Sequence, residues 1–188
     1  MEVKKVSGHK AAIAITALAA TLVTLALIFV VLWLHGAFLP RWIEWDNNAE
    51  ELIPEGVAEV LSDDWLIQDA LMLDIDGDGA GESVLLVWKR GSYGLRRPTW
   101  VKRDEIGFSQ HIFIYKDYSD PAISQEEASH FEGGWHPVWM SSKLSFEVTT
   151  FREGGEIPGT GRMCLETVTP EGDIYRWGWL SWGLQRVE

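Results

Sequence analysis

The densest group of chemically useful side chains is the stretch DIDGDGAGE, residues 74–82, with four carboxylates and three glycines in nine positions. Carboxylates at alternate positions of a loop can turn inward around a cation, and a glycine after the third acid permits a sharp reversal of the chain. Oxygen ligands in this number suit Ca²⁺ better than Mg²⁺, which keeps more of its water. The stretch therefore predicts a calcium-binding loop.

Two alternatives are weaker. A solvated turn is the first, since Asp and Gly are the usual turn formers, but four acids in one short loop repel one another unless a cation lies among them. An EF-hand is the second, but its twelfth position, which must be a bidentate Glu, is Leu85 here, and the flanking residues are typical of strands. We expect calcium in this loop to stabilise the fold, with no need for a signalling role.

The pattern D-x-D-x-D-G-x-x-[DE] between two strand-like segments resembles the calcium loop of FG-GAP repeats, the blade units of integrin alpha chains and of bacterial VCBS-type proteins. The resemblance covers residues 66–90 and is specific at the loop. It implies five calcium ligands, namely the side chains of Asp74, Asp76, Asp78 and Glu82 and the carbonyl of Ala80. The loop occurs once, and residues 41–188 are too few for a full propeller, so the expected fold is a compact antiparallel β domain with blade-like hairpins.

Strands must position this loop. Beyond residue 68, β-branched and aromatic residues come in short runs separated by Gly, Pro and Asp. These runs predict strands at residues 70–73, 83–89, 111–116, 144–149, 163–168 and 174–187. Both alternating faces of residues 111–115 are apolar, so we expect both to be covered. Residues 47–61, with Pro54 near a helix start, predict a short helix before the first strand.

The N-terminal region predicts a membrane anchor. Residues 11–34 contain no Asp, Glu, Lys or Arg, and as a helix they are long enough to cross a hydrocarbon layer of ~30 Å. A cleaved signal peptide or a buried core helix is the alternative, but the run is longer than a signal peptide's apolar region and ends in a poor cleavage site. Three lysines precede it and acidic residues follow. The positive-inside rule then predicts residues 1–10 in the cytoplasm, with a juxtamembrane segment (35–62) and a β domain (63–188) outside.

Charge and cysteine content exclude some partners and one source of stability. Residues 1–40 carry three Lys and one Glu, which leaves 13 Lys and Arg against 27 Asp and Glu in residues 41–188. Such an acidic domain repels nucleic acid, so we expect no nucleic-acid partner. Cys164 is the only cysteine, so no disulfide can form within the chain. Stability must come from packing or from a metal ion.

Two further groups of side chains could bind a ligand. A basic island at residues 89–103 could hold an anionic polymer or lipid headgroups, although its arginines could equally pair with nearby acids. Tryptophans near the C-terminus could stack on sugar rings, although tryptophan at strand spacing is more often part of a core. The candidate ligand-binding residues are Arg96, Arg97, Trp100, Trp177 and Trp179.

Catalysis is less favoured than binding. Neither a Gly-x-Ser-x-Gly nor a His-Glu-x-x-His motif occurs, and His130 and His136 lack a recognisable third metal ligand. We therefore expect a single-pass cell-envelope protein whose extracytoplasmic, calcium-binding β domain binds or scaffolds an envelope protein or a cell-wall glycan. The alternative is a membrane-tethered cell-wall or carbohydrate-binding module or hydrolase.

Overall fold

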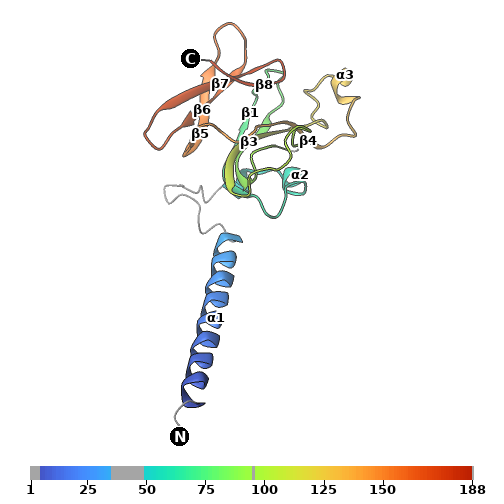
Figure 1. The fold of residues 1–188 in the computed structure, drawn as a ribbon. Helices are drawn as coiled ribbons and strands as arrows, with labels where there is room; N and C mark the ends of the chain where they lie inside the picture. Colours follow the sequence, from blue (N-terminus) through green and yellow to red (C-terminus); the bar gives the residue numbers. More distant parts are fainter. Residues whose placement is uncertain (1–4, 35–48, 95, 188) are drawn as a thin grey trace. The chain divides into compact units, whose positions relative to one another are not determined.

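A computed structural model describes residues 5–34, 49–94 and 96–187, and the chain divides into two compact units, residues 1–40 and 41–188. The first unit contains helix α1, Lys5–Leu34, which begins before the predicted span (Figure 1). Its stretch Ile15–Leu32 is exposed, and by length and composition it can cross a membrane. The hydroxyls of Thr21 and Thr24 donate to carbonyls one turn earlier, at 3.0 Å each, so neither needs water as a partner.

The second unit is mostly β, as predicted, and is built from two four-stranded antiparallel sheets (Figure 1). In each sheet the strands lie in chain order. The first sheet contains β1 (Leu66–Leu73), β2 (Glu82–Arg90), β3 (Phe108–Asp117) and β4 (Trp135–Met140). The second contains β5 (Thr150–Glu156), β6 (Met163–Val168), β7 (Ile174–Leu180) and β8 (Gly183–Arg186). Its described residues also contain three short helices: η1 (Ala49–Leu52), α2 (Glu55–Ala58) and α3 (Gln125–Ala128).

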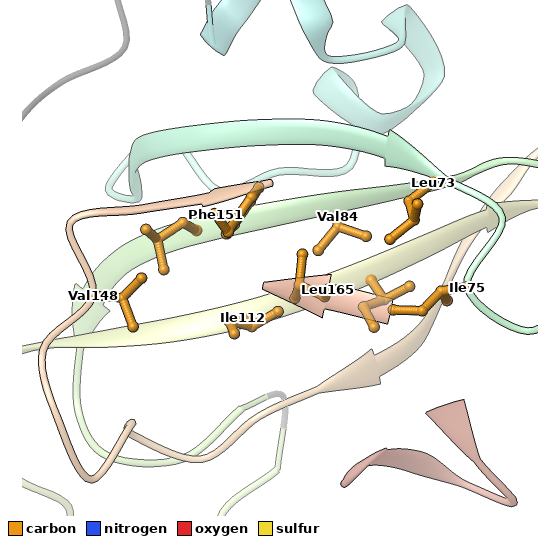
Figure 2. Packing of buried hydrophobic residues seen from close by; sticks show 9 residues of the cluster. Leu73, Ile75, Val84, Ile112, Val148, Phe151 and Leu165 are labelled. Atoms are coloured by element: carbon orange, nitrogen blue, oxygen red, sulfur yellow. The ribbon is translucent and has the colours of Figure 1, made fainter. Parts of the chain in front are cut away.

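One hydrophobic cluster joins the two sheets. Alternate side chains of β1, β2 and β3 meet residues from the second sheet and from the segment that leads into it, as Figure 2 shows. The buried members are Leu73, Ile75, Val84, Leu86, Ile112, Ile114, Val148, Phe151 and Leu165. At the edge of this cluster the carboxylate of Asp69, in β1, accepts hydrogen bonds from the Thr150 hydroxyl at 2.6 Å and the Phe151 amide at 3.0 Å.

The opposite face of the first sheet is covered by the N-terminal part of the domain. Phe113 and Tyr115 of β3 pack there with Val57 of α2 and Ala49 of η1. The prediction that both faces of residues 111–115 are covered is therefore confirmed. The predicted helix within residues 47–61 is two short turns instead, and its first residues, together with the rest of 35–48, lie outside the described part of the chain.

The prediction of a strand at residues 144–149 was wrong. This segment contains bends, and Leu144, Phe146 and Val148 all pack against the inter-sheet cluster, which produces the alternating pattern. Its backbone forms only isolated bonds to strands: the amide of Leu144 donates to the carbonyl of Gln110 at 2.9 Å, and the amide of Thr149 donates to that of Val168 at 2.7 Å. Between them, the amide of Val148 donates to the side chain of Gln110 at 2.8 Å, and its carbonyl accepts from the side chains of Gln110 at 2.6 Å and Gln68 at 3.2 Å.

Strands β4 and β5 were not predicted from the sequence. One predicted strand, at residues 174–187, is a hairpin of two strands. β4 is an edge strand that contains Pro137, which cannot donate to a ladder. β5 contains a pair of glycines at an irregular pairing between Glu153 and Glu156, so it lacks the pattern of a strand. The predicted strand at 174–187 breaks at Ser181, where φ is 58°, to form β7 and β8.

Candidate metal centre

The acidic loop connects β1 to β2 and is shaped by its own carboxylates. The carboxylate of Asp74 accepts hydrogen bonds from the amides of Gly77 at 2.8 Å and Gly79 at 3.1 Å. Both glycines have positive φ, 80° and 92°, a conformation that other residues rarely adopt. Asp78 likewise accepts from the amide of Ala80 at 2.8 Å. These bonds turn the carboxylates toward the inside of the loop.

Three of the predicted ligands converge. One oxygen from each of Asp74, Asp76 and Asp78 lies within 4.8 Å of the others. Oxygens that bind Ca²⁺ lie about 2.3–2.6 Å from the ion, so two of them on opposite sides are about 5 Å apart. The spacing of the three aspartates therefore fits a single metal ion, and this cluster could hold one.

A cation already lies among the carboxylates, and it belongs to the protein. The ammonium nitrogen Nζ of Lys116, near the end of β3, lies 2.6 Å from an oxygen of Asp76 and 2.5 Å from an oxygen of Asp78. It also lies 3.4 Å from Glu127 and 3.6 Å from Glu82, and its side chain is only 2% exposed. Lys116 thus supplies part of the positive charge that the clustered acids need.

Sheet register brings Lys116 to this position. β2 and β3 are antiparallel with Ser83 opposite Tyr115, so Lys116 follows at the same end of the sheet as Glu82, where the acidic loop ends and β2 begins. Lys116 follows an apolar run in the sequence. A charged residue at the end of a strand that is buried on both sides indicates a buried ion pair, but it does not indicate which acids are the partners. Lys116 was not predicted as a site residue, because its contact with the acidic loop depends on the pairing of β2 with β3.

Glu82 is the most deeply buried of the four acids. It is 1% exposed, and its Oε2 accepts a hydrogen bond from the Ile75 amide at 2.9 Å. Its Oε1 is also buried and accepts no hydrogen bond from the described residues, and the nearest cation is Nζ of Lys116 at 3.6 Å. Burial, with the charge of Asp76 as the next cause, raises the pKa of Glu82 to about 8. Without a metal ion the carboxyl group therefore holds a proton at neutral pH.

Burial and the clustered charges also shift the pKa values of Asp76 and Lys116. Burial raises the pKa of Asp76, and the ammonium of Lys116 only partly offsets that effect. Burial would lower the pKa of Lys116, but the carboxylates of Asp76 and Asp78 outweigh it, so the pKa lies above its ordinary value. Lys116 is thus charged at neutral pH, and Glu82 is the member of this cluster whose pKa is moved toward neutrality.

The metal-free domain should lose stability as pH rises. Glu82 has a pKa of about 8 when folded and 4.5 in its unperturbed state, so between these values the folded chain binds more protons than the unfolded chain. Its contribution is therefore complete below pH 4.5 and is lost as pH approaches 8, at a slope of up to about 1 kcal/mol per pH unit. Melting of the full chain in EGTA across this range measures the slope. Glu82→Gln should flatten it and the exposed Glu132→Gln should not; an unchanged slope in Glu82→Gln would assign the effect to another group.

The other predicted site residues lie elsewhere. The side chain of Ala80 packs against Tyr118 and Ile123, beneath the loop. Arg96, Arg97 and Trp100 are exposed in the β2–β3 connection, where Arg96 lines a hollow of about 530 Å³. Both tryptophans of β7 are partly buried against the inter-sheet cluster. Trp177 stacks on Phe146 and donates to Thr167, whereas Trp179 also lines a cavity beside the acidic loop.

Comparisons of the chain with protein-family models, with curated proteins and with solved structures found no match.

Proposed function

We propose that residues 74–82 bind Ca²⁺, and that the protein is a single-pass membrane protein whose β domain lies outside the cytoplasm and has a binding or scaffolding role. Oε1 of Glu82 carries the proposal for the metal. It is a buried carboxylate oxygen that accepts no hydrogen bond and lies 3.6 Å from Nζ of Lys116, at the edge of a cluster of aspartates whose oxygens fit one ion. The resemblance of the loop to FG-GAP calcium loops, with Asp74, Asp76, Asp78 and Glu82 as side-chain ligands and Ala80 as a carbonyl ligand, supports the same assignment.

The lysine alone is a poor counter-ion for this loop. An ammonium group has three N–H donors, whereas carboxylates from four residues lie around Nζ of Lys116. A calcium ion carries twice the charge and accepts six to eight oxygen ligands. It would also bind Glu82 in its charged form, which removes the reason for the retained proton. Calcium therefore satisfies groups that Lys116 leaves unsatisfied.

Calcium and the lysine cannot both hold the same oxygens. Nζ is within 2.6 Å of Asp76 and Asp78, where the ion would bind, so Lys116 must move for calcium to enter. Glu127, 3.4 Å away and partly exposed beside the neighbouring cavity, offers the displaced ammonium a second partner. Breaking the lysine contacts lowers the net affinity, which suits a site that works at the millimolar calcium found outside cells.

The N-terminal helix supports the anchor and the orientation. Ile15–Leu32 is long and apolar enough to span a membrane. Three lysines precede the helix and acidic residues follow it, which by the positive-inside rule favours an extracytoplasmic β domain. Outside the cell the loop meets enough calcium to be occupied. The partner of the domain would then be another envelope protein or a cell-wall glycan.

One experiment tests the metal and the orientation together. Right-side-out membrane vesicles that carry the full chain receive papain, a protease that needs no calcium, on the outside with either 1 mM calcium or EGTA. For a dissociation constant of about 10⁻⁴ M, calcium should lower the unfolded population about tenfold, and the fragment with the acidic loop should disappear about tenfold more slowly. Asp74→Asn should remove this protection, because it removes a ligand that makes no contact with Lys116.

The two parts of the proposal fail in different ways. Equal digestion with calcium and with EGTA would rule out a stabilising calcium site. A fragment that survives in right-side-out vesicles but not in inverted ones would place the domain in the cytoplasm. The double variant Glu126→Gln, Glu132→Gln removes two exposed acids outside the loop and should behave as the natural chain does.

A further inference from the structure

A cavity of about 400 Å³ opens beside the acidic loop, at the place where the two sheets meet. Its walls come from the β3–β4 connection, from β4 and from the turn between β7 and β8. Asp76, Glu82 and Lys116 form part of its lining, so it borders the metal centre without being part of it. Aromatic rings form much of the remainder: Tyr118, Phe131, Trp179 and Trp182.

Two of the aromatic side chains that line the cavity are exposed to solvent. Tyr118 and Phe131 stack with their centroids 3.7 Å apart, which fixes both rings in one orientation. Trp182 is 75% exposed at the tip of the β7–β8 turn, and Phe131 is 39% exposed. Trp182 therefore contributes little to stability by burial, and Phe131 leaves part of its ring uncovered. Their exposed area is available to a ligand.

The β7–β8 turn has two residues that are unfavourable for a purely structural turn. It is a two-residue connection in which Ser181 has φ 58°, a conformation that Gly or Asn adopts more readily. Trp182, the second turn residue, is large and exposed where a small polar residue would fold as well. Local strain and an exposed aromatic ring at one turn are common at binding sites and unusual in purely structural turns. The turn instead holds the indole at the mouth of the cavity.

The charge of the cavity favours a cation. Asp76, Glu127 and the protonatable Glu82 line it, and the single positive group of the lining, Lys116, is held by carboxylates. Glu127 is partly exposed, at 43% of its side chain, so its carboxylate can accept from a ligand. The described lining has more carboxylates than ammonium groups, so it would repel an anion, whereas a cation would meet carboxylates and aromatic rings.

We propose that this cavity binds an organic ammonium ion, with the cationic group against Trp182 and the Tyr118–Phe131 pair and with Glu127 as its counter-ion. Aromatic rings with a nearby carboxylate recognise ammonium groups by cation–π attraction and charge. The cavity is large enough for a trimethylammonium group, and it is open on the side of Trp182. Calcium in the adjacent loop would displace Lys116 toward Glu127. We therefore expect choline to bind more weakly in calcium than in EGTA, and the test is carried out under both conditions.

Choline and 3,3-dimethyl-1-butanol provide the critical comparison, because the two molecules have the same shape and only choline is charged. Binding is measured by saturation-transfer NMR on the full chain in phosphatidylglycerol nanodiscs, with empty nanodiscs as the blank. We expect choline to bind at least tenfold more tightly than the neutral alcohol. Equal binding of both would overturn the proposal in favour of a simple apolar pocket.

Variants locate the site. Trp182→Ala should weaken choline binding about tenfold, and Trp182→Phe, which keeps an aromatic face, should recover part of it. Trp100→Ala removes an equally exposed tryptophan outside the cavity, 82% exposed, and should change nothing. Glu127→Gln should weaken choline binding without affecting the neutral alcohol. Loss of binding in Trp100→Ala, no binding in the natural chain, or binding of glucose in place of choline would each overturn the proposal.

Discussion

Replacing Lys116 with methionine should destabilise the calcium-free domain by about 3–5 kcal/mol, and calcium should restore most of that loss. The side chain of Lys116 is 2% exposed, and its ammonium lies within 3.6 Å of carboxylates from four residues. Methionine fills a similar volume but has no charge. The buried acids would then repel one another and would have to take up protons or leave the interior.

Calcium reverses the loss because it is the better counter-ion. In the natural chain the ion must first displace Lys116, and part of its binding free energy is consumed in breaking those contacts. In Lys116→Met this competition is absent. If the competing contacts cost about 3 kcal/mol, calcium affinity should rise by about 100-fold. A variant that is less stable without calcium and binds calcium more tightly is the signature of a lysine that competes for the metal position.

Urea unfolding of the full chain in detergent micelles, with calcium and with EGTA, measures both effects. Lys143→Met is the matched control, since Lys143 also pairs with an acid, Glu105, but both side chains are exposed, at 46% and 59%. That exposed pair should contribute under about 1 kcal/mol. Destabilisation of Lys116→Met that calcium does not relieve would mean that Lys116 is the permanent counter-ion of the loop, and would contradict a metal centre.

Local sequence was enough to predict the loop and insufficient to predict its cation. The alternation of Asp74, Asp76 and Asp78 is local, and so is the need for glycine at positive φ in Gly77 and Gly79. These features lie within one turn and make the acidic loop visible without a fold. Lys116 lies 40 residues from Asp76 in the chain, and only the pairing of β3 with β2 brings it to the loop. Long-range register is the information that a single sequence does not display.

The same limit explains which strands were found. β2, β3 and β6 are buried strands with continuous apolar or β-branched runs, and their positions were predicted closely. Residues 144–149 have the alternation of a strand because one face is buried, yet they form no continuous ladder with a neighbouring strand. Alternation indicates which side chains are buried and does not indicate what the backbone bonds to. At Val148 the backbone partners are the side chains of two glutamines in the first sheet, Gln68 and Gln110.

Those glutamines support the second large prediction: Gln110→Leu should destabilise the domain by about 3–4 kcal/mol. Gln110 is 4% exposed, its Oε1 accepts from the Val148 amide at 2.8 Å, and its Nε2 donates to the Val148 carbonyl at 2.6 Å and to Gln68 at 2.8 Å. Leucine is of similar size and leaves the Val148 amide without this partner inside the protein. Each buried polar group left unpaired costs about 1–3 kcal/mol, so the loss exceeds that of an ordinary hydrogen bond.

The part of the domain that loses stability in Gln110→Leu distinguishes a specific role of the Gln110–Val148 bonds from a general contribution to core packing. The segment around Val148 leads from the first sheet to the second, so weakening it should loosen the second sheet before the first. Hydrogen exchange of the full chain should therefore speed up in β5 and β6 more than in β2 and β3. Gln185→Leu, at an exposed position of β8, is the matched control and should change stability by less than about 0.5 kcal/mol. Uniform acceleration across both sheets in Gln110→Leu would show that the glutamine contributes to one cooperative core, and that its bonds to Val148 do not specifically hold the two sheets together.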